Sequence, residues 1–256
     1  MSNFLTPKEI AESFVNVGKN KAALSVAKML ILGICAGVFI GFGSYGCTVA
    51  NAGAGALLDA TVAKFIGAAV FPVGLMFVVF FGAELFTGNN LMTISLLKKE
   101  ITMSQMLKNW GIVYVGNFIG SVLLAWLFLK SGLYGEAMVA KAVAIAEAKV
   151  AIPLGAVVIR AIFCNIFVVL AVWIAAGAKD IVGKIFGIWF PIMLFVFAGF
   201  EHCVANMFFI PMGYFVGADI TWGQIFINNL IPVTIGNIIG GGILVPVTAY
   251  FACLRK

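Results

Sequence analysis

The sequence predicts an all-α membrane protein in which six transmembrane helices form an inverted repeat and two of the helices are broken. Three observations lead to this prediction: an apolar composition, six long uncharged stretches and a repeated polar motif. Of the 256 residues, 63% are hydrophobic and 10% are charged, whereas about a quarter of the residues in a soluble domain are charged. We therefore expect the chain to lie within a lipid bilayer.

Six uncharged stretches approach or reach the length of about 20 residues that a helix needs to cross the hydrocarbon core. They cover residues 29–50, 65–83, 112–129, 161–178, 185–200 and part of 220–254. Because these stretches leave no room for a sizeable soluble domain, we expect one transmembrane domain over residues 1–256.

An amphipathic helix is predicted before the first span, within residues 1–24. Thr6 suits the N-cap, Pro7 suits the first turn, and Glu9 completes a capping box. Ile10 and Phe14 alternate with charged residues, so we expect this helix to lie along the membrane interface. The segment lacks a long apolar core and a small-residue cleavage site, and we do not expect it to be a signal peptide.

The net charge of +6 does not indicate a nucleic-acid partner, because the basic residues are spread over the loops. With six spans and a cytoplasmic N-terminus, eleven basic residues fall on the cytoplasmic side and four on the other. The eleven are Lys8, Lys19, Lys21, Lys28, Lys98, Lys99, Lys108, Lys179, Lys184, Arg255 and Lys256; the four are Lys64, Lys130, Lys141 and Lys149, with Arg160 left out. The positive-inside rule therefore predicts that both termini are cytoplasmic.

The cysteines and the single histidine do not form a catalytic or metal-binding pattern. Cys35, Cys47, Cys164, Cys203 and Cys253 all fall in or beside the apolar stretches, and none has the C-x-x-C spacing. We expect buried free thiols. The sequence shows no nucleophile paired with the histidine and no phosphate-binding loop, so we predict neither an enzyme nor a bound cofactor or metal.

An internal repeat relates the two halves of the sequence. The segment ITMSQMLKN at 101–109 matches ITWGQIFIN at 220–228 with a separation of 119 residues, which pairs Asn109 with Asn228. GNFIG at 116–120 matches GNIIG at 236–240 with a separation of 120 residues, which implies one inserted residue. Upstream, Glu84 and Asn89 match Glu201 and Asn206 with a separation of 117 residues.

The repeat predicts two copies that cross the membrane in opposite directions, because each half contains an odd number of spans. We place the first copy at 25–130 and the second at 150–254. Inverted repeats place a binding site near the bilayer midplane, between broken helices whose N-termini direct positive partial charge at an anion. The arrangement resembles the plan of an aquaporin.

The segment FFGAELFTGNN at 80–90 is the predicted break in the second span. Here a long apolar run meets a carboxylate, a hydroxyl, a glycine and two amides. A non-helical backbone at this depth is tolerated only when it is buried in protein or faces a water-filled cavity. We expect Thr87 at this break and a twin break within 197–206.

His202 is the strongest candidate for a functional role in the second break, because an ionisable residue is costly to place in a membrane without a function. The alternative is a structural histidine. Glu201 lies about 100° from it around a helix and has a repeat partner in Glu84. We interpret both carboxylates, with Asn89 and Asn206, as structural groups that accept hydrogen bonds from broken backbone or pair with a neighbouring subunit.

Each of the other candidate residues has a functional and a structural interpretation. The hydroxyl of Thr87 can donate to an anion or satisfy a freed carbonyl, and Asn165 can bind a ligand or bridge helices. Lys149, just outside the fourth span, can raise the local anion concentration or be a solvated surface lysine. Phe71 and Phe195, like Leu75, are by default core or lipid-facing residues.

Three motifs resemble the signatures of the formate/nitrite transporter family: FGAELFTGN, FEHCVANMF and CNIFVVLAVW at 164–173. The resemblance extends over nearly the whole chain. It implies an aquaporin-like protomer with six spans, a homopentamer with one pore in each protomer, and transport of small monovalent anions such as formate, nitrite, hydrosulfide or lactate. It also implies a multi-pass protein of the bacterial cytoplasmic (inner) membrane.

The resemblance assigns roles to individual residues. The pore residues it implies are Thr87, His202 and Asn165, with Lys149 in the vestibule; the hydrophobic constrictions it implies are Phe71, Leu75 and Phe195 on one side and Leu85 on the other. Because both aromatic constriction residues are present, formate is favoured over nitrite.

A mechanism follows from the cost of moving a bare anion through an apolar constriction. Desolvation raises the pKa of a weak acid, so an anion drawn in by Lys149 becomes easier to protonate, and His202 with Thr87 and Asn165 is placed to relay the proton. Anion permeation and proton symport are both open. The alternatives are a hydrosulfide-selective channel, a lactate, water or neutral-solute channel, a membrane-embedded enzyme that uses Glu84, Glu201 and His202, and a structural or sensor protein.

Overall fold

The computed structural model describes residues 4–55 and 57–255, and the regular structure in this part of the chain is helical apart from one isolated pairing of Phe4 with Ala178. Lys256, counted above with the cytoplasmic residues, lies outside the described residues. Six spans in the described chain are long and apolar enough to cross a membrane: Val26–Gly55 (α2), Ala60–Phe81, Met103–Lys130 (α7), Leu154–Gly177 (α9), Ile181–Ala198 (α10) and Trp222–Cys253. The prediction of an all-α protein with six spans is confirmed.

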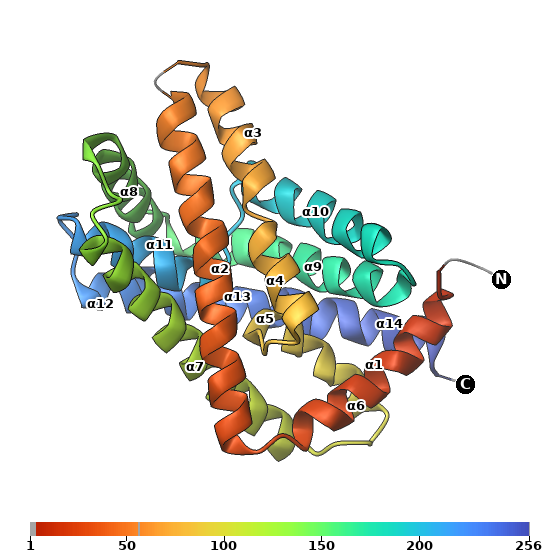
Figure 1. Ribbon diagram of the computed structural model, residues 1–256. Helices are drawn as coiled ribbons and strands as arrows, with labels where there is room; N and C mark the ends of the chain where they lie inside the picture. Colours follow the sequence, from red (N-terminus) through yellow and green to blue (C-terminus); the bar gives the residue numbers. More distant parts are fainter. Residues whose placement is uncertain (1–3, 56, 256) are drawn as a thin grey trace.

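Several of these spans are built from shorter pieces. The second consists of α3 (Ala60–Val70) and α4 (Val73–Phe81). The sixth consists of α12 (Trp222–Gln224), a π-helix (Ile225–Leu230), α13 (Ile231–Asn237), a second π-helix (Ile238–Leu244) and α14 (Val245–Cys253). In Figure 1 α2 and α3 stand side by side, α13 passes behind α2, and α10 and α9 lie to the right of α3.

Two helices break inside the bundle, as predicted. After α4 the chain turns at Gly82 (φ 76°) and continues into α5 (Phe86–Asn89), a 3₁₀ turn (Asn90–Met92) and α6 (Thr93–Leu97). After α10 it turns at Gly199 (φ 79°) and continues into α11 (Cys203–Phe215). Both glycines take the left-handed conformation that ends a helix without strain. The first break therefore precedes Thr87, which lies inside α5 instead of at the break.

Two amphipathic helices flank the spans. The first, α1 (Pro7–Ala22), begins with the predicted capping box of Thr6 and Glu9, and the hydrogen bonds that Thr6 donates lower the pKa of the Glu9 carboxyl. Its buried Phe14 packs beside α6, α9 and α14, and Figure 1 shows α1 next to both chain ends. The second, α8 (Glu136–Val150), was not predicted, and it packs on α2 and α11.

The structure corrects the register of the repeat. Capping boxes at Thr102 and Thr221 start α7 and α12 at matching positions. The π-helix Ile225–Leu230 then accommodates one extra residue, since its hydrogen bonds span five residues instead of four. The sequence predicted Asn228 as the counterpart of Asn109. In the structure the counterpart is Asn229.

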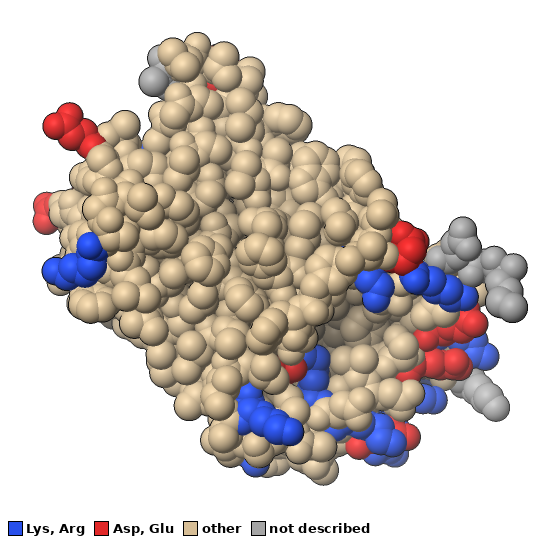
Figure 2. Space-filling model, viewed as in Figure 1, with Lys and Arg blue, Asp and Glu red and all other residues tan. Residues whose placement is uncertain are grey.

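Charged side chains are absent from a broad middle region of the visible face. Figure 2 shows the surface over α2, α3, α4 and α10 as uncharged, with Lys, Arg, Asp and Glu gathered around α1 and at the opposite end near α8 and α12. An uncharged belt between two charged ends is the surface that a bilayer requires.

Glycines at the helix crossings allow the backbones to approach closely. A Cβ atom at Gly120 of α7 would overlap the carbonyl of Ile34 in α2, and one at Gly240 would overlap the carbonyl of Ile162 in α9. These two glycines occupy matching positions in GNFIG and GNIIG, so the same close crossing occurs once in each half. Small residues at such positions drive helix association in membranes.

We predict that Gly120→Ala destabilises the protein by about 1–3 kcal/mol, because the added methyl group forces α2 and α7 apart. The matched control is Gly111→Ala in the same helix, where a Cβ atom would meet nothing within 4 Å. Thermal or denaturant unfolding in detergent should show a loss for the first variant and none for the second. Equal behaviour of the two variants would contradict the close crossing.

Candidate functional site: a pore between two broken helices

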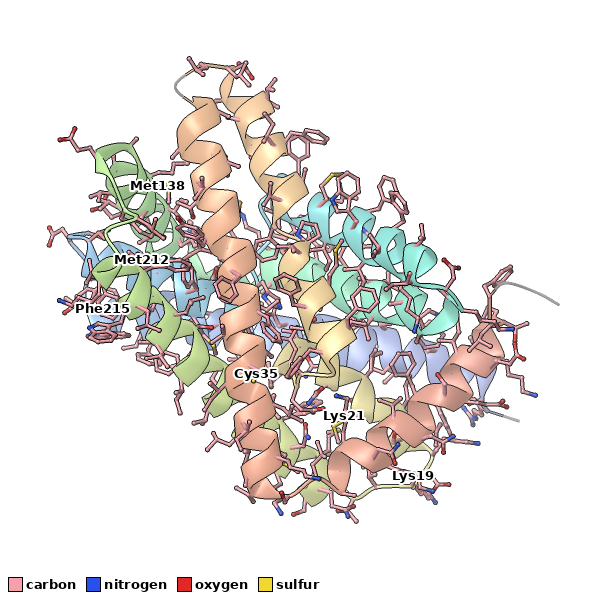
Figure 3. The ribbon with its side chains drawn as sticks, viewed as in Figure 1. Lys19, Lys21, Cys35, Met138, Met212 and Phe215 are labelled. Carbon is pink, nitrogen blue, oxygen red and sulfur yellow. The ribbon has the colours of Figure 1, made fainter. Side chains whose placement is uncertain are left out.

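The first break is held by a buried network around Glu84. The amide of Asn89 donates to Glu84 Oε2 at 2.6 Å and to Asn109 Oδ1 at 2.8 Å. Lys21, near the end of α1, forms an ion pair with Glu84, and its carbonyl accepts a hydrogen bond from Asn109 at 3.3 Å. Figure 3 shows Lys21 on the side of α1 that faces α4 and α5, and Lys19 on its outer edge.

The second break is held by the same network around Glu201. The amide of Asn206 donates to Glu201 Oε2 and to Asn229 Oδ1, both at 2.7 Å. Lys149, near the end of α8, forms an ion pair with Glu201 at 2.8 Å, and its carbonyl accepts from Asn229 at 3.0 Å. Both carboxylates thus pair with lysines of the same chain, and not with a neighbouring subunit, which was one interpretation of the sequence.

Asn117 and Asn237 satisfy the backbone that the breaks expose. Asn117 donates to the carbonyls of Gly33 and Glu84 at 2.8 and 2.9 Å and accepts from the N–H of Phe86 at 2.9 Å. Asn237 makes the same three bonds to Ala161, Glu201 and Cys203, at 2.8, 2.9 and 2.9 Å. The repeated GNFIG and GNIIG motifs contained the signal for these residues, but sequence reasoning assigned them no role.

Thr87 and His202 meet where the two short helices approach each other. Thr87 Oγ1 lies 2.8 Å from His202 Nε2, and both side chains are buried. His202 is the N-cap of α11, and its Nδ1 accepts the N–H of Ala205 at 3.1 Å. Because Nδ1 is an acceptor, the proton of the neutral ring is assigned to Nε2, which donates to Thr87. The hydroxyl proton of Thr87 is then available for a third group.

One pocket includes His202, and a second lies beside the first break. A cavity of about 320 Å³, here called the Lys149 pocket, has Phe71, Phe195 and His202 among its lining residues. A second of about 280 Å³, the Lys21 pocket, has Leu75 and Leu85 among its lining residues. Figure 2 shows the surface hollowed between α1 and α4, and this second pocket is lined by residues of both helices.

The four residues predicted to form constrictions are divided between the two pockets. The rings of Phe71 and Phe195 meet edge to face with centroids 5.6 Å apart, and Phe195 also lies 5.9 Å from the ring of His202. The resemblance grouped Leu75 with the two phenylalanines. In the structure Leu75 lines the Lys21 pocket with Leu85, because it lies one turn beyond Phe71 along the second span.

Asn165 bridges helices in this structure. Its amide donates to Asn90 Oδ1 at 2.7 Å and to the carbonyl of Asn237 at 2.8 Å, so both of its hydrogens bind protein groups. The donors that would serve an anion are therefore occupied, while Asn165 Oδ1 and Asn90 Nδ2 are without partners among the described residues. Asn206 likewise uses both amide hydrogens within the Glu201 network.

Comparison with known proteins identifies the family. The family model for the formate/nitrite transporter matches residues 8–251. The chain belongs to the formate/nitrite transporter family. It is 42% identical to the formate channel BtFdhC of Bacillus thuringiensis, over 99% of this chain and 97% of that protein, and 41% identical to a probable formate transporter of Methanothermobacter thermautotrophicus, over 100% and 99%.

Solved structures agree with this assignment. A pentameric formate channel with formate bound matches with a TM-score of 0.80 and 33% identity, over 90% of this chain and 98% of that one. The family and this structure are transporters and channels, so membership decides against the membrane-embedded enzyme considered from the sequence.

We predict that Lys149→Met costs about 3–5 kcal/mol of stability, because it leaves the Glu201 carboxylate buried without a counter-charge. The side chains of this pair are 17% and 5% exposed. The control is Lys19→Met, whose partner is Glu100 at 2.8 Å in a pair 48% and 42% exposed; because water screens this pair, the control should change stability far less than Lys149→Met.

A double variant separates charge from packing in this experiment. Adding Glu201→Gln to Lys149→Met removes the unpaired charge and should restore part of the lost stability in unfolding measurements. If the double variant is no more stable than Lys149→Met alone, the ion pair does not hold the second break.

Proposed function

We propose that the protein transports a small monovalent anion, with formate as the leading candidate, through one pore in each protomer. The observation that supports this most directly is the Thr87–His202 hydrogen bond of 2.8 Å, with one pocket that includes His202 and a second beside the first break. The Phe71–Phe195 pair lines one pocket and Leu75 and Leu85 line the other, so the anion must lose its water before it reaches Thr87 and His202.

The descriptions of the relatives favour formate over nitrite and hydrosulfide. Two relatives that align over nearly the whole chain are described as formate channels or transporters. A panel of anions therefore tests the substrate, with nitrite, hydrosulfide and lactate as the competing candidates and glycerol as the neutral solute.

In the proposed mechanism the Thr87 hydroxyl donates to the anion while His202 Nε2 donates to Thr87. Loss of water raises the pKa of the weak acid, so the anion becomes easier to protonate at this position. A proton that enters from pocket water replaces the one that passes to the anion, so the pair itself keeps its charge. The substrate then crosses the remaining apolar section as the neutral acid, which avoids most of the desolvation cost.

We predict that His202→Asn uncouples uptake from the proton gradient. Asparagine still bonds to Thr87 but cannot relay a proton at neutral pH, so formate flux into liposomes should lose its dependence on an inward proton gradient. The matched control is Tyr114→Phe, which removes a partly buried hydrogen bond of 2.9 Å to Thr234; neither residue lines a pocket. Unchanged proton coupling in His202→Asn would refute the relay.

We also propose a homopentamer in the bacterial cytoplasmic membrane with both termini in the cytoplasm. The similar structure described as a pentameric formate channel and the eleven basic residues on the predicted cytoplasmic side support this. Native mass spectrometry of the detergent-solubilised protein should give five times the 27.2 kDa chain mass. A monomeric or trimeric mass would contradict the pentamer but would leave the proposed pore within each protomer unaffected.

A further inference from the structure

The lysines best placed near the breaks contribute little net charge to the pockets. Lys149 is paired with Glu201 and Lys21 with Glu84, and all four side chains are largely buried. Each pair carries one positive and one negative charge, so at the distance of an anion entering the pocket its two fields largely cancel. The charge that attracts an anion must come from other residues.

Two further lysines line the Lys149 pocket. Lys141 lies two turns before Lys149 on the same face of α8, with Ile145 between them, and all three line the pocket. Lys64, from the first part of α3, lies with its ammonium 5.8 Å from the ring centroid of Phe197 and beside Gly199. Neither lysine forms an ion pair within the part of the chain that the structure describes.

The Lys21 pocket contains one lysine in a similar position. Lys184 is the fourth residue of α10, as Lys64 is the fifth residue of α3, and each stands at the start of a broken span. Lys184 lines the pocket that also contains Gly82, while Lys64 lines the pocket that contains Gly199. Each lysine therefore comes from the half opposite to the break it faces. Among described residues Lys184 has no ion-pair partner.

The nearest carboxylates on these helices are committed to the helix starts. Asp59 accepts the N–H of Thr61 at 2.7 Å and caps α3, and Asp180 accepts the N–H of Gly183 at 2.7 Å and caps α10. The bonds from Thr61 also hold the pKa of Asp59 below its usual value. Both carboxylates offset the positive end of a helix, and neither lines a pocket.

We propose that Lys64 and Lys141 at one pocket and Lys184 at the other concentrate the transported anion, whereas Lys149 and Lys21 serve to hold the breaks. This inference rests on the proposed anion transport. A pocket with low-dielectric walls focuses the field of unpaired charges and raises the local concentration of the opposite ion. One unit charge at about 10 Å in water changes that concentration about twofold.

The test compares formate entry through each face of liposomes that contain protein of determined orientation. Formate is kept well below saturation, and ionic strength is set to about 0.01 M and then to about 0.5 M, where screening shortens the reach of these charges severalfold. The variants are Lys64→Gln with Lys141→Gln, and Lys184→Gln alone. The control is Lys130→Gln, since Lys130 lines neither pocket.

At low ionic strength the double variant should slow entry from the Lys149 pocket about fourfold, and Lys184→Gln should slow entry from the Lys21 pocket about twofold. Both differences should nearly vanish at high ionic strength, and Lys→Arg at each position should restore the rate. Lys130→Gln should match the unmodified protein. Melting temperatures in detergent verify that the variants are folded.

Different failures have different meanings. If the unmodified protein moves neither formate nor another anion of the panel, the proposed function is wrong. The assignment of charge to Lys64, Lys141 and Lys184 is wrong in two cases, provided that the unmodified protein moves formate. In the first, formate enters through the variants as fast as through the unmodified protein at low ionic strength. In the second, the variants slow formate entry equally at both ionic strengths. An equal loss in Lys130→Gln also overturns it, because the effect would then be one of general surface charge.

Discussion

The structure depends on one constraint: a backbone that stops being helical inside a bilayer must find its hydrogen-bond partners within the protein or in a water-filled cavity. An unsatisfied backbone group in hydrocarbon costs several kcal/mol. Asn117 and Asn237 help to meet this requirement. Each lies in a neighbouring span, and its side-chain amide hydrogen-bonds to backbone groups of the non-helical segment at one break. With the extended segments fixed, the N-termini of α5 and α11 are held toward the pore.

The two breaks are alike in their supports and differ at the N-cap of the helix that follows. Leu85 is the N-cap of α5 and makes no capping bond, while His202 is the N-cap of α11 and accepts the N–H of Ala205. That cap uses Nδ1 and leaves Nε2 directed at Thr87. The hydrogen bond that caps the start of α11 thus also sets the tautomer of the His202 ring. The difference at this N-cap position gives one pocket the imidazole of His202 and the other the apolar side chain of Leu85.

The sequence was sufficient for the features that repeat or that have span length. It predicted six spans, two breaks and the capping box of α1 because apolar length, glycines and cap residues act locally. The helix α8 was missed because it is shorter than a span and carries lysine and glutamate, although its many alanines favour a helix. The π-helix near Asn229 was also missed, because an inserted residue in a repeat does not reveal where the helix absorbs it.

The sequence could not show which residues form ion pairs or hydrogen bonds across the fold. Lys149 and Glu201 are 52 residues apart, and only the packing of α8 against α11 shows that the lysine neutralises the carboxylate. Asn165 of α9 is a second example: a residue with free donors could bind an anion, but both of its amide hydrogens are used, one by Asn90 and one by Asn237 of α13. Function inferred from residue type therefore had to be revised by counting which hydrogen-bonding groups remain unused.

The correspondence between α1 and α8 explains why an amphipathic helix precedes the first span. Each helix ends with a lysine whose ammonium pairs with a break carboxylate and whose carbonyl binds the network asparagine, Asn109 for Lys21 and Asn229 for Lys149. α1 thus contributes two groups of Lys21 to the network that holds the first break. Because Glu84 is buried, moving α1 away would leave that carboxylate without its counter-charge, and this cost holds the helix in place beside the Lys21 pocket.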